Sequence, residues 1–362
     1  MMVNKVVHFF KIPQNFFQQN FIIGCDSEMS HNANIDNQWE PPLLPVGTTI
    51  GNFEIIQLIG EGGYGQIYEV LDQNNRTPYA MKIEYLTTRK KGLQLEIKVL
   101  KECNFPSLFP AFIDSGRTTD FRFYVMELLG PSLSKICTIL PGNHLTKYTL
   151  LHVGIHMIQC ISSLHSKGYI HRDIKPANFL LRPDRDNPLC FIDFGLARKY
   201  LTETGEIKPP REYPGYTGTT RYASINAHDE KELGRRDDLF SWFYSMIELS
   251  AGSLPWPGSQ NEELTIKMKK EMTPEELCTS LPPVFIDIYK MIQKLGFEDE
   301  PDYLAIINLL KQAIKDANFV VHQYDWEKLS ISELDKISSI RLVMDYDTTG
   351  IYQVENGCCQ VF

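Results

Sequence analysis

Residues 171–195 read HRDIKPANFLLRPDRDNPLCFIDFG, and the rest of the chain is interpreted from this stretch. It holds two carboxylates, Asp173 and Asp193, and Lys175 and Asn178 follow the first of them closely. Asp173 can accept a hydrogen bond from an acceptor hydroxyl and orient it, and Lys175 can meet a transferred group with its charge. Asn178 and Asp193 offer the oxygen ligands that Mg²⁺ prefers. Together these residue types indicate a site for phosphoryl transfer from ATP.

Length, charge and cysteine content narrow the class of protein. At 362 residues the chain exceeds what one hydrophobic core usually serves, so we expect two lobes or domains. The net charge of −9 argues against nucleic acid as the main partner. Eight cysteines without paired spacing indicate neither a zinc site nor a disulfide framework, and they favour a cytoplasmic or nuclear location. No run of residues reaches the length of a membrane span.

The residues from Asn52 to Leu129 have the pattern of a small β-rich lobe. Short apolar runs bounded by turn residues predict strands at 53–60, 66–72, 78–84, 111–117 and 121–128, and a helix at 93–102. Gly60, Gly62 and Gly65 form a Gly-x-Gly-x-x-Gly pattern between the first two strands. This pattern also opens dinucleotide-binding folds, but there a helix follows it. Because a strand follows it here, we expect a glycine hairpin over nucleotide phosphates.

Lys82 lies in the third predicted strand among apolar neighbours, and a buried ammonium must be paired. Glu96 on the predicted helix is the expected partner, and the ion pair would hold Lys82 against the α- and β-phosphates. The alternative is two unrelated surface charges. Gly130-Pro131 then breaks the pattern, so residues 126–129 are expected to connect the lobes with the backbone of Leu128 and Leu129 facing the adenine.

Helical periodicity dominates the residues after the break. Apolar residues recur at helical spacing from Leu150 to Leu164, and a helix from Asp237 to Gly252 is apolar on all sides, as in the core of a lobe. His152 and His156 are four residues apart, but a packed or exposed helix face is favoured over a metal pair there. We predict an extended or disordered arm at 1–45, lobes at 50–129 and 130–328, and a loosely attached tail at 329–362.

The assembled motifs resemble the eukaryotic protein kinase family over residues 50 to about 326. His-Arg-Asp is followed by four residues and Asn178, and Asp-Phe-Gly begins fifteen residues after that asparagine. The sequence GTTRYASIN at 218–226, in place of Ala-Pro-Glu, is similar to the casein kinase 1 superfamily, as are MELLGPSL at 126–133 and SLPWPG at 253–258. The runs IKPPR, NAHDEKELGRRDDLFSWFY and YDWEK resemble its tau-tubulin kinase branch more closely.

The resemblance implies a bilobal α+β fold, with a small antiparallel sheet and one main helix above a larger helical lobe. It implies Mg-ATP as co-substrate and serine or threonine of protein substrates as acceptor, which Lys175, two residues after Asp173, also supports. Thr219 would hydrogen-bond both of these residues, and Asn178 and Asp193 would hold the metal. The nucleotide site would consist of Ile59, Gly60, Glu61, Gly62, Gly63, Tyr64, Gly65, Gln66, Ile67, Ala80, Lys82, Glu127, Leu128, Leu129, Leu180 and Ile192.

The resemblance also implies a preference for acidic or phosphorylated substrates, because Arg221, Gly258 and Lys267 fall on the positions of an anion site. Arg221 and Lys267 are expected to converge beside the acceptor. Asn226 replaces a glutamate that in most kinases pairs with an arginine of the large lobe, so that ion pair should be missing.

Two expectations concern control of the chain. Lys208 and Arg211 neighbour Glu206 and Glu212, so local pairing would order this segment and give basal activity without its phosphorylation. Cys359 stands fourth from the last residue and fits a prenylation box, with Cys358 as a candidate second lipid site. Two ordinary exposed cysteines are the favoured alternative, since a four-residue motif arises easily by chance. We expect a monomer that meets a membrane only if Cys359 is lipidated.

Two other functions could use some of the same residues. A catalytically dead scaffold typically loses the lysine, the loop aspartate or the metal aspartate, but Lys82, Asp173, Asn178 and Asp193 are all present. A small-molecule kinase could share the phosphate loop, but it would not need the long segment from Gly195 to Asn226 that would lay a peptide near Asp173.

Overall fold

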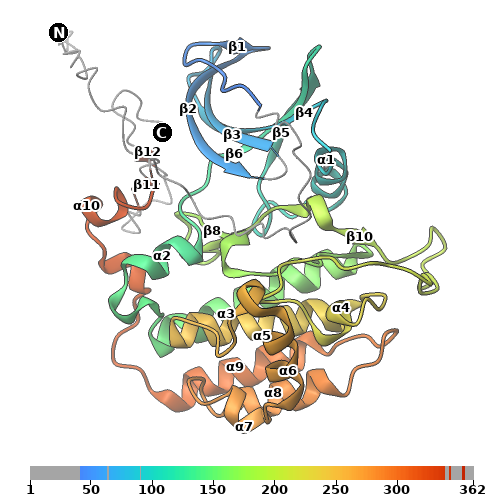
Figure 1. Ribbon diagram of the computed structural model, residues 1–362. Helices are drawn as coiled ribbons and strands as arrows, with labels where there is room; N and C mark the ends of the chain where they lie inside the picture. Colours follow the sequence, from blue (N-terminus) through green and yellow to red (C-terminus); the bar gives the residue numbers. More distant parts are fainter. Residues whose placement is uncertain (1–40, 63–64, 90, 339–341, 344–352, 355–362) are drawn as a thin grey trace.

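The structure is a computed structural model that describes residues 41–62, 65–89, 91–338, 342–343 and 353–354. Two lobes stacked on one another make up this part of the chain (Figure 1). A curled antiparallel sheet with one helix forms the small lobe, and helices form the larger one. The expected bilobal α+β fold is therefore confirmed.

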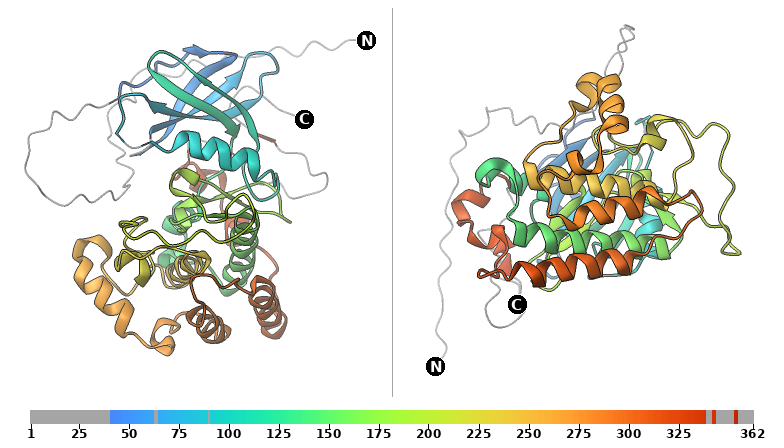
Figure 2. Two further views of the ribbon diagram at one scale, coloured as in Figure 1. Left: turned by 90° about the vertical axis from the view of Figure 1, so that its right-hand side faces the viewer. Right: turned by 90° about the horizontal axis from the view of Figure 1, so that it is seen from below.

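The small lobe is a six-stranded sheet in the order β1-β2-β3-β4-β6-β5, with antiparallel neighbours throughout. Its strands are β1 Thr49–Ile50, β2 Phe53–Gly62, β3 Gly65–Asp72, β4 Pro78–Tyr85, β5 Phe112–Arg117 and β6 Phe121–Glu127. Alternate side chains of these strands form a buried apolar cluster that includes Ile55, Val70, Met81 and Val125. Helix α1, Leu93–Glu102, packs beside β4, β5 and β6 (Figure 2). The expected strands and helix are confirmed, whereas the two-residue β1 was not predicted.

The last residues of the predicted arm belong to the small lobe, which corrects the boundary at 45. The Leu44 N–H donates to the Tyr68 hydroxyl at 3.0 Å, and the Tyr85 hydroxyl donates to the Pro42 carbonyl at 2.6 Å. Leu44 also packs against the apolar cluster of the sheet. Because the partners lie 24 and 43 residues away in the chain, local sequence could not indicate these contacts. Residues 1–40 lie outside the described part.

The large lobe is built around α5, Arg235–Ala251, whose side chains are buried on nearly all sides, as its apolar sequence predicts. Helix α3, Lys147–Ser166, packs against α5 and against α9, Tyr303–Ala317 (Figure 2). The remaining helices are α2 Leu133–Ile139, α4 Ile225–His228, α6 Glu262–Glu271, α7 Pro274–Leu277, α8 Val284–Gln293 and α10 Ile331–Leu334. Two-stranded ladders join β7 Tyr169–Ile170 to β10 Arg198–Lys199, β8 Phe179–Leu181 to β9 Leu189–Phe191, and β11 Leu342–Val343 to β12 Gln353–Val354.

The first part of the predicted tail is packed against the large lobe. Leu329, Leu334 and Ile337 lie against its main apolar cluster. Just before them, the Asp325 carboxylate accepts hydrogen bonds from the N–H and the hydroxyl of Thr146, at 2.7 and 2.9 Å. The tail is therefore attached at least as far as residue 338, which corrects the expectation of a loose tail from 329. Cys358 and Cys359 lie outside the described residues.

Within the described ranges, no helix combines the length and the apolar character needed to cross a bilayer.

Candidate active site

One short ladder brings the two halves of the 171–195 stretch together. β8 pairs with β9, so Asn178, just before β8, lies near Asp193, soon after β9. The Ile192 N–H donates to the Asn178 carbonyl at 3.0 Å. Arg172 and Asp193 both have left-handed backbone angles, with φ of 70° and 67°. Such angles are costly for these residue types and are concentrated at functional sites, where the surrounding fold holds them.

Asp173 lies in a compact polar cluster at the mouth of the large lobe. The Thr219 hydroxyl donates to Asp173 Oδ1 at 2.7 Å, and Lys175 Nζ lies 2.9 Å from Asp173 Oδ2. Lys175 also donates to the Thr219 hydroxyl at 3.1 Å. The hydrogen bonds expected for Thr219 are therefore present. The cluster holds the Asp173 carboxylate in one orientation, as positioning of an acceptor hydroxyl requires.

The Asp238 carboxylate holds the backbone of the loop that carries Asp173, a role that the sequence did not indicate. This buried carboxylate accepts hydrogen bonds from the N–H groups of His171 and Arg172, at 2.7 and 2.8 Å. Its Oδ2 also lies 2.8 Å from His165 Nε2. Burial alone would raise the pKa of Asp238, but the hydrogen bond and charge of His165 and the backbone donors bring it below its ordinary value. The available signal was an acidic pair that opens an otherwise apolar helix.

Lys82 lies between two carboxylates at the junction of the lobes. Its Nζ is 2.6 Å from Glu96 Oε1 and 3.1 Å from Asp193 Oδ1, so the expected ion pair with Glu96 is present. The Tyr124 hydroxyl donates to the other oxygen of Glu96 at 2.8 Å. Burial would lower the pKa of the Lys82 ammonium, but Asp193 and Glu96 raise it above its ordinary value, and Lys82 is charged.

The chemistry of Asn178 and Asp193 fits a hard divalent cation. The Asn178 amide nitrogen donates to the Asp173 carbonyl at 2.9 Å, which leaves the amide oxygen as a ligand. Among the described residues, no group of three or more His, Cys, Asp or Glu side chains could hold a metal ion. An ion here would therefore combine these two residues with phosphate and water oxygens, as Mg²⁺ commonly does. Asp193 also contacts Lys82, so it links the candidate ion site to the small lobe.

Strand register places several of the predicted nucleotide residues along one part of the sheet. Gly60 is opposite Ile67, and Ile67 is opposite Lys82. Gly65 has a φ of 133°, and a Cβ there would collide with the carbonyl of Ile83, so only glycine fits this position. Gly62, Ala80, Leu128, Leu129, Leu180 and Ile192 are also described, but Gly63 and Tyr64 lie outside the described residues. Enclosure of the adenine by this set stays a prediction.

Three polar members of the predicted nucleotide site have their side chains engaged by other residues. Arg182 binds both carboxylate oxygens of Glu127 at 2.8 and 2.7 Å, so a role for Glu127 toward a nucleotide would fall to its backbone. The fully buried Gln66 amide donates to Glu61 at 3.1 Å and to the Pro41 carbonyl at 3.3 Å. The end of the arm therefore contacts the strand that follows the glycine pattern.

The expected convergence of Arg221 and Lys267 beside the acceptor stays a prediction. Lys267 is exposed, whereas the buried Lys269, about 200° around the axis of α6, lies against the segment that carries Arg221. Lys269 Nζ donates to the carbonyls of Thr220 and Ala223 at 2.7 and 2.8 Å. A helix turns by 100° per residue, so a shift of two positions reverses the face, and spacing alone did not indicate which lysine turns inward.

Arg221 itself is held by an acidic residue of α5. Its guanidinium lies 2.7 Å from Glu248 Oε1, while its side chain keeps 34% exposure. A Cβ at Gly258 would collide with the Arg221 side chain, so these two predicted members of the anion site do lie together. Asn226 donates to Asp237 at 2.8 Å in place of the glutamate ion pair that it lacks.

The local ion pairs predicted within the segment after the Asp-Phe-Gly motif are wrong. Arg211 pairs with Glu232, beyond the segment, at 2.6 Å. Lys208 Nζ donates to the Lys199 carbonyl at 3.0 Å. The neighbouring glutamates were expected because they are close in sequence, but the folded segment turns Arg211 toward the loop that follows α4.

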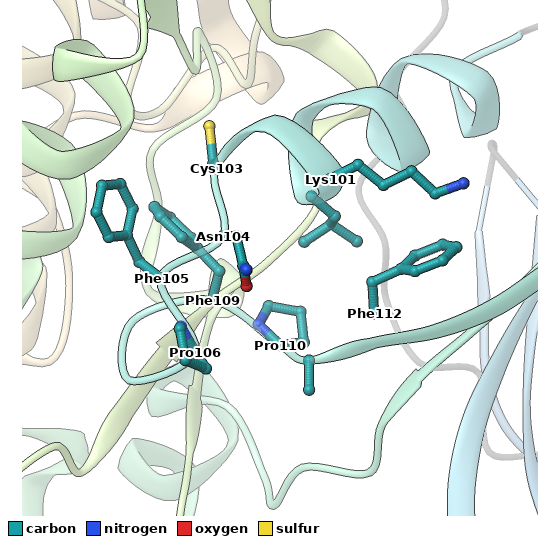
Figure 3. Close-up of a pocket in the computed structure, with 10 residues that line it drawn as sticks. Lys101, Cys103, Asn104, Phe105, Pro106, Phe109, Pro110 and Phe112 are labelled. Atoms are coloured by element: carbon teal, nitrogen blue, oxygen red, sulfur yellow. The ribbon is translucent and has the colours of Figure 1, made fainter.

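A surface hollow of about 270 Å³ lies beside the end of α1 (Figure 3). Lys101, Cys103, Phe105 and Phe112 are among the residues that line it. Phe109, also in the lining, packs edge-on against Phe194 of the Asp-Phe-Gly motif with ring centroids 5.5 Å apart. Phe109 therefore connects the wall of the hollow to the Asp-Phe-Gly motif.

Comparison with known proteins identifies the family. Residues 53–310 match the protein kinase domain. The chain belongs to the protein kinase family. It is also 38% identical over 280 residues to a probable serine/threonine-protein kinase of Dictyostelium discoideum, an alignment that covers 76% of this chain and 57% of that relative. The chain thus spans little more than half the length of this relative.

Proposed function

We propose that the chain is a serine/threonine protein kinase that transfers the γ-phosphoryl group of Mg-ATP to protein substrates. The observation that carries this proposal is the simultaneous presence of two arrangements, Lys82 between Glu96 and Asp193, and Asp173 between Lys175 and Thr219. The first suits phosphate and metal binding, and the second suits orientation of an acceptor hydroxyl. Both must be assembled at once for in-line transfer.

Several features support serine or threonine as the acceptor and Mg²⁺ as the ion. Lys175 contacts Asp173 directly, in the position that the catalytic loop of serine/threonine kinases gives it, and the Dictyostelium relative carries that description in its name. Two oxygen ligands without nitrogen or sulfur favour Mg²⁺ over softer ions. Within the family, the motifs at 126–133, 218–226 and 253–258 support a place in the casein kinase 1 superfamily, near its tau-tubulin kinase branch.

A preference for acidic or phosphorylated sites is the finer part of the proposal. Arg221, partly exposed and adjacent to the segment that carries Thr219, supports it because a guanidinium binds phosphate through two parallel hydrogen bonds. Glu248 already holds that guanidinium, so a substrate phosphate would have to share it. We therefore propose a modest preference that depends on Arg221.

We also propose that the chain is a cytoplasmic or nuclear monomer. The five described cysteines, Cys103, Cys137, Cys160, Cys190 and Cys278, are buried free thiols, as expected in a reducing compartment. Lipidation of Cys359 stays a prediction that the intact mass of the protein from its own cells would test. An unmodified Cys359 with residues 360–362 still present would rule out prenylation.

The decisive experiment is transfer of radiolabelled phosphate from ATP to casein, followed by phosphoamino-acid analysis. We expect labelled serine or threonine, loss of the label when EDTA removes divalent ions, and its return with Mg²⁺. Asp173→Asn should lower kcat by about 10²- to 10⁴-fold, since the group that orients the acceptor is lost. The matched control is Asp186→Asn, the same chemical change at an exposed position, which should keep full activity. An Asp173→Asn protein as active as the control would refute the proposal, and a wild type without transfer would favour the scaffold.

A further inference from the structure

A buried carboxylate joins two distant parts of the segment that follows the Asp-Phe-Gly motif. Glu232 lies in the short loop between α4 and α5, and its side chain is only 4% exposed. The segment leaves the large lobe after β10 as the long yellow-green excursion in Figure 1 and returns near this loop. A glutamate so deeply buried must be compensated by donors, and both of its oxygens are.

The donors are two arginines of the segment. Arg211 donates to Glu232 Oε2 from Nε at 2.6 Å and to Oε1 from its terminal nitrogen at 3.1 Å. The Arg211 backbone N–H adds a third hydrogen bond to Oε2 at 3.1 Å. Arg198 Nε lies 3.0 Å from Oε1. One carboxylate thus holds residues 198 and 211 together with the bidentate geometry that guanidinium groups give to carboxylates and phosphates.

A third arginine, Arg172, is influenced by the charges of the same residues. Arg172, directly before Asp173, donates from Nε to the Leu196 carbonyl at 2.7 Å. Burial and the charges of Arg198 and Arg211 lower the pKa of the Arg172 guanidinium to about 10, while Asp238 and Glu232 act in the opposite direction. Glu232 therefore compensates part of the positive charge that Arg172, Arg198 and Arg211 bring to this region.

We propose that Glu232 is a positioning residue that takes the place of an activation-segment phosphate, so that the segment is held in its working arrangement without phosphorylation. In protein kinases, a phosphate added to this segment orders it through new pairs with arginines. Here the same kind of arginine cluster is already bound by a carboxylate from outside the segment. The inference rests on the proposed kinase activity, and it replaces the local pairs that the sequence suggested.

The contact can reach the reacting groups through two short paths. Arg198 belongs to β10, which pairs with β7 immediately before His171. Arg172 is the neighbour of Asp173, and its side chain binds the carbonyl of Leu196, two residues before Arg198. Release of Arg198 and Arg211 would therefore loosen the strand and the loop that place Asp173. Glu232 therefore acts on Asp173 through the arginines and not by contact with the substrate.

The test uses the full chain, treated with phosphatase and shown by intact mass to carry no phosphate. We expect Glu232→Ala to lower kcat by about tenfold or more, with little change in the KM for ATP. Hydrogen exchange should rise in residues 199–215. Glu230→Gln is the matched control in the same loop, because Glu230 is exposed, and it should behave as wild type.

Two further measurements separate positioning from a general loss of stability. Sodium acetate should restore part of the kcat of Glu232→Ala, compared with sodium chloride at the same ionic strength, because it returns a carboxylate to the arginine cluster. The double variant Glu232→Gln/Arg211→Gln should lose no more activity than the worse single variant, since both act through one contact. If Glu232→Ala does not fold, the single variants Glu232→Gln and Arg211→Gln replace it in the kinetic and exchange measurements.

Phosphate-free Glu232→Ala or Glu232→Gln protein with the kcat of wild type would overturn the proposal. So would a loss that acetate does not relieve together with additive effects in the double variant. Failure of the proposed kinase activity is recognised separately, since wild type would then transfer no phosphate to casein. The hydrogen exchange comparison does not depend on that transfer and would still show whether Glu232 orders residues 199–215.

Discussion

Replacement of Glu96 by glutamine tests the ion pair that joins the lobes. Glutamine keeps the size and one carbonyl oxygen of the side chain but removes its charge, so Lys82 Nζ would lose its carboxylate partner at 2.6 Å. Asp193 remains at 3.1 Å, and it would become the main counter-ion of Lys82. An aspartate drawn to the lysine in this way is less available to a metal ion. We expect lower activity together with a modest loss of stability.

The magnitude follows from the burial of the pair. Lys82 is 7% and Glu96 1% exposed, so solvent screens their interaction little. A hydrogen bond to a charged group contributes about 1.5–3 kcal/mol, and breaking a buried pair costs about 3–5 kcal/mol when the remaining charge has no partner. Because Asp193 stays as a partner, we expect the interaction that positions Lys82 to weaken by about 2–3 kcal/mol. The same loss of transition-state stabilisation corresponds to a decrease of about 30- to 150-fold in kcat/KM.

The assay compares kcat/KM for casein at saturating ATP, with the KM for ATP measured separately. Glu102→Gln is the matched control, since it makes the same change on the same helix at a side chain that is 38% exposed. That surface contact should contribute at most about 1 kcal/mol. A Glu96→Gln protein within about threefold of wild type would refute the role of the pair, because that change is under 1 kcal/mol.

Three other changes probe the regions around the site. Burial lowers the pKa of the Lys269 ammonium to about 7 from 10.5, so the folded chain binds this proton more weakly than the unfolded chain, and wild-type stability should rise with pH across that range. Relative to Lys269→Met, the wild-type free energy of unfolding, measured in urea, should rise by up to about 1.4 kcal/mol per pH unit. A difference between the two proteins that does not change with pH would contradict this expectation. Arg221→Ala should lower kcat/KM more on a phosphorylated peptide than on its plain form, and equal losses on the two peptides would remove the proposed preference. Tyr68→Phe leaves the Leu44 N–H without its acceptor and should lower the free energy of unfolding by about 1–2 kcal/mol, and unchanged stability would show that this hydrogen bond contributes nothing.

The sequence alone indicated the main strands and helices and the residue types of the candidate site. The expected helix at 93–102 has the observed bounds, because its apolar residues repeat with the period of a helix. Roles for Asp173, Asn178 and Asp193 could be predicted because phosphoryl transfer needs these residue types and the spacing of the motif is specific. The ion pair of Lys82 followed from a different argument, that a lysine in an apolar strand requires a partner.

The tertiary structure alone decided which distant residues support those groups. Asp238 lies 67 residues after His171, and Glu232 lies 21 residues after Arg211, so no local pattern connects either pair. Lys267 and Lys269 look alike in the sequence, and only the packing of α6 shows which one turns toward Ala223. Charged residues in loops have no periodicity to read, and their partners depend on the direction that the folded backbone gives each side chain. A sequence specifies the chemistry that a position can supply, whereas the distances that join these positions arise only when the chain is folded.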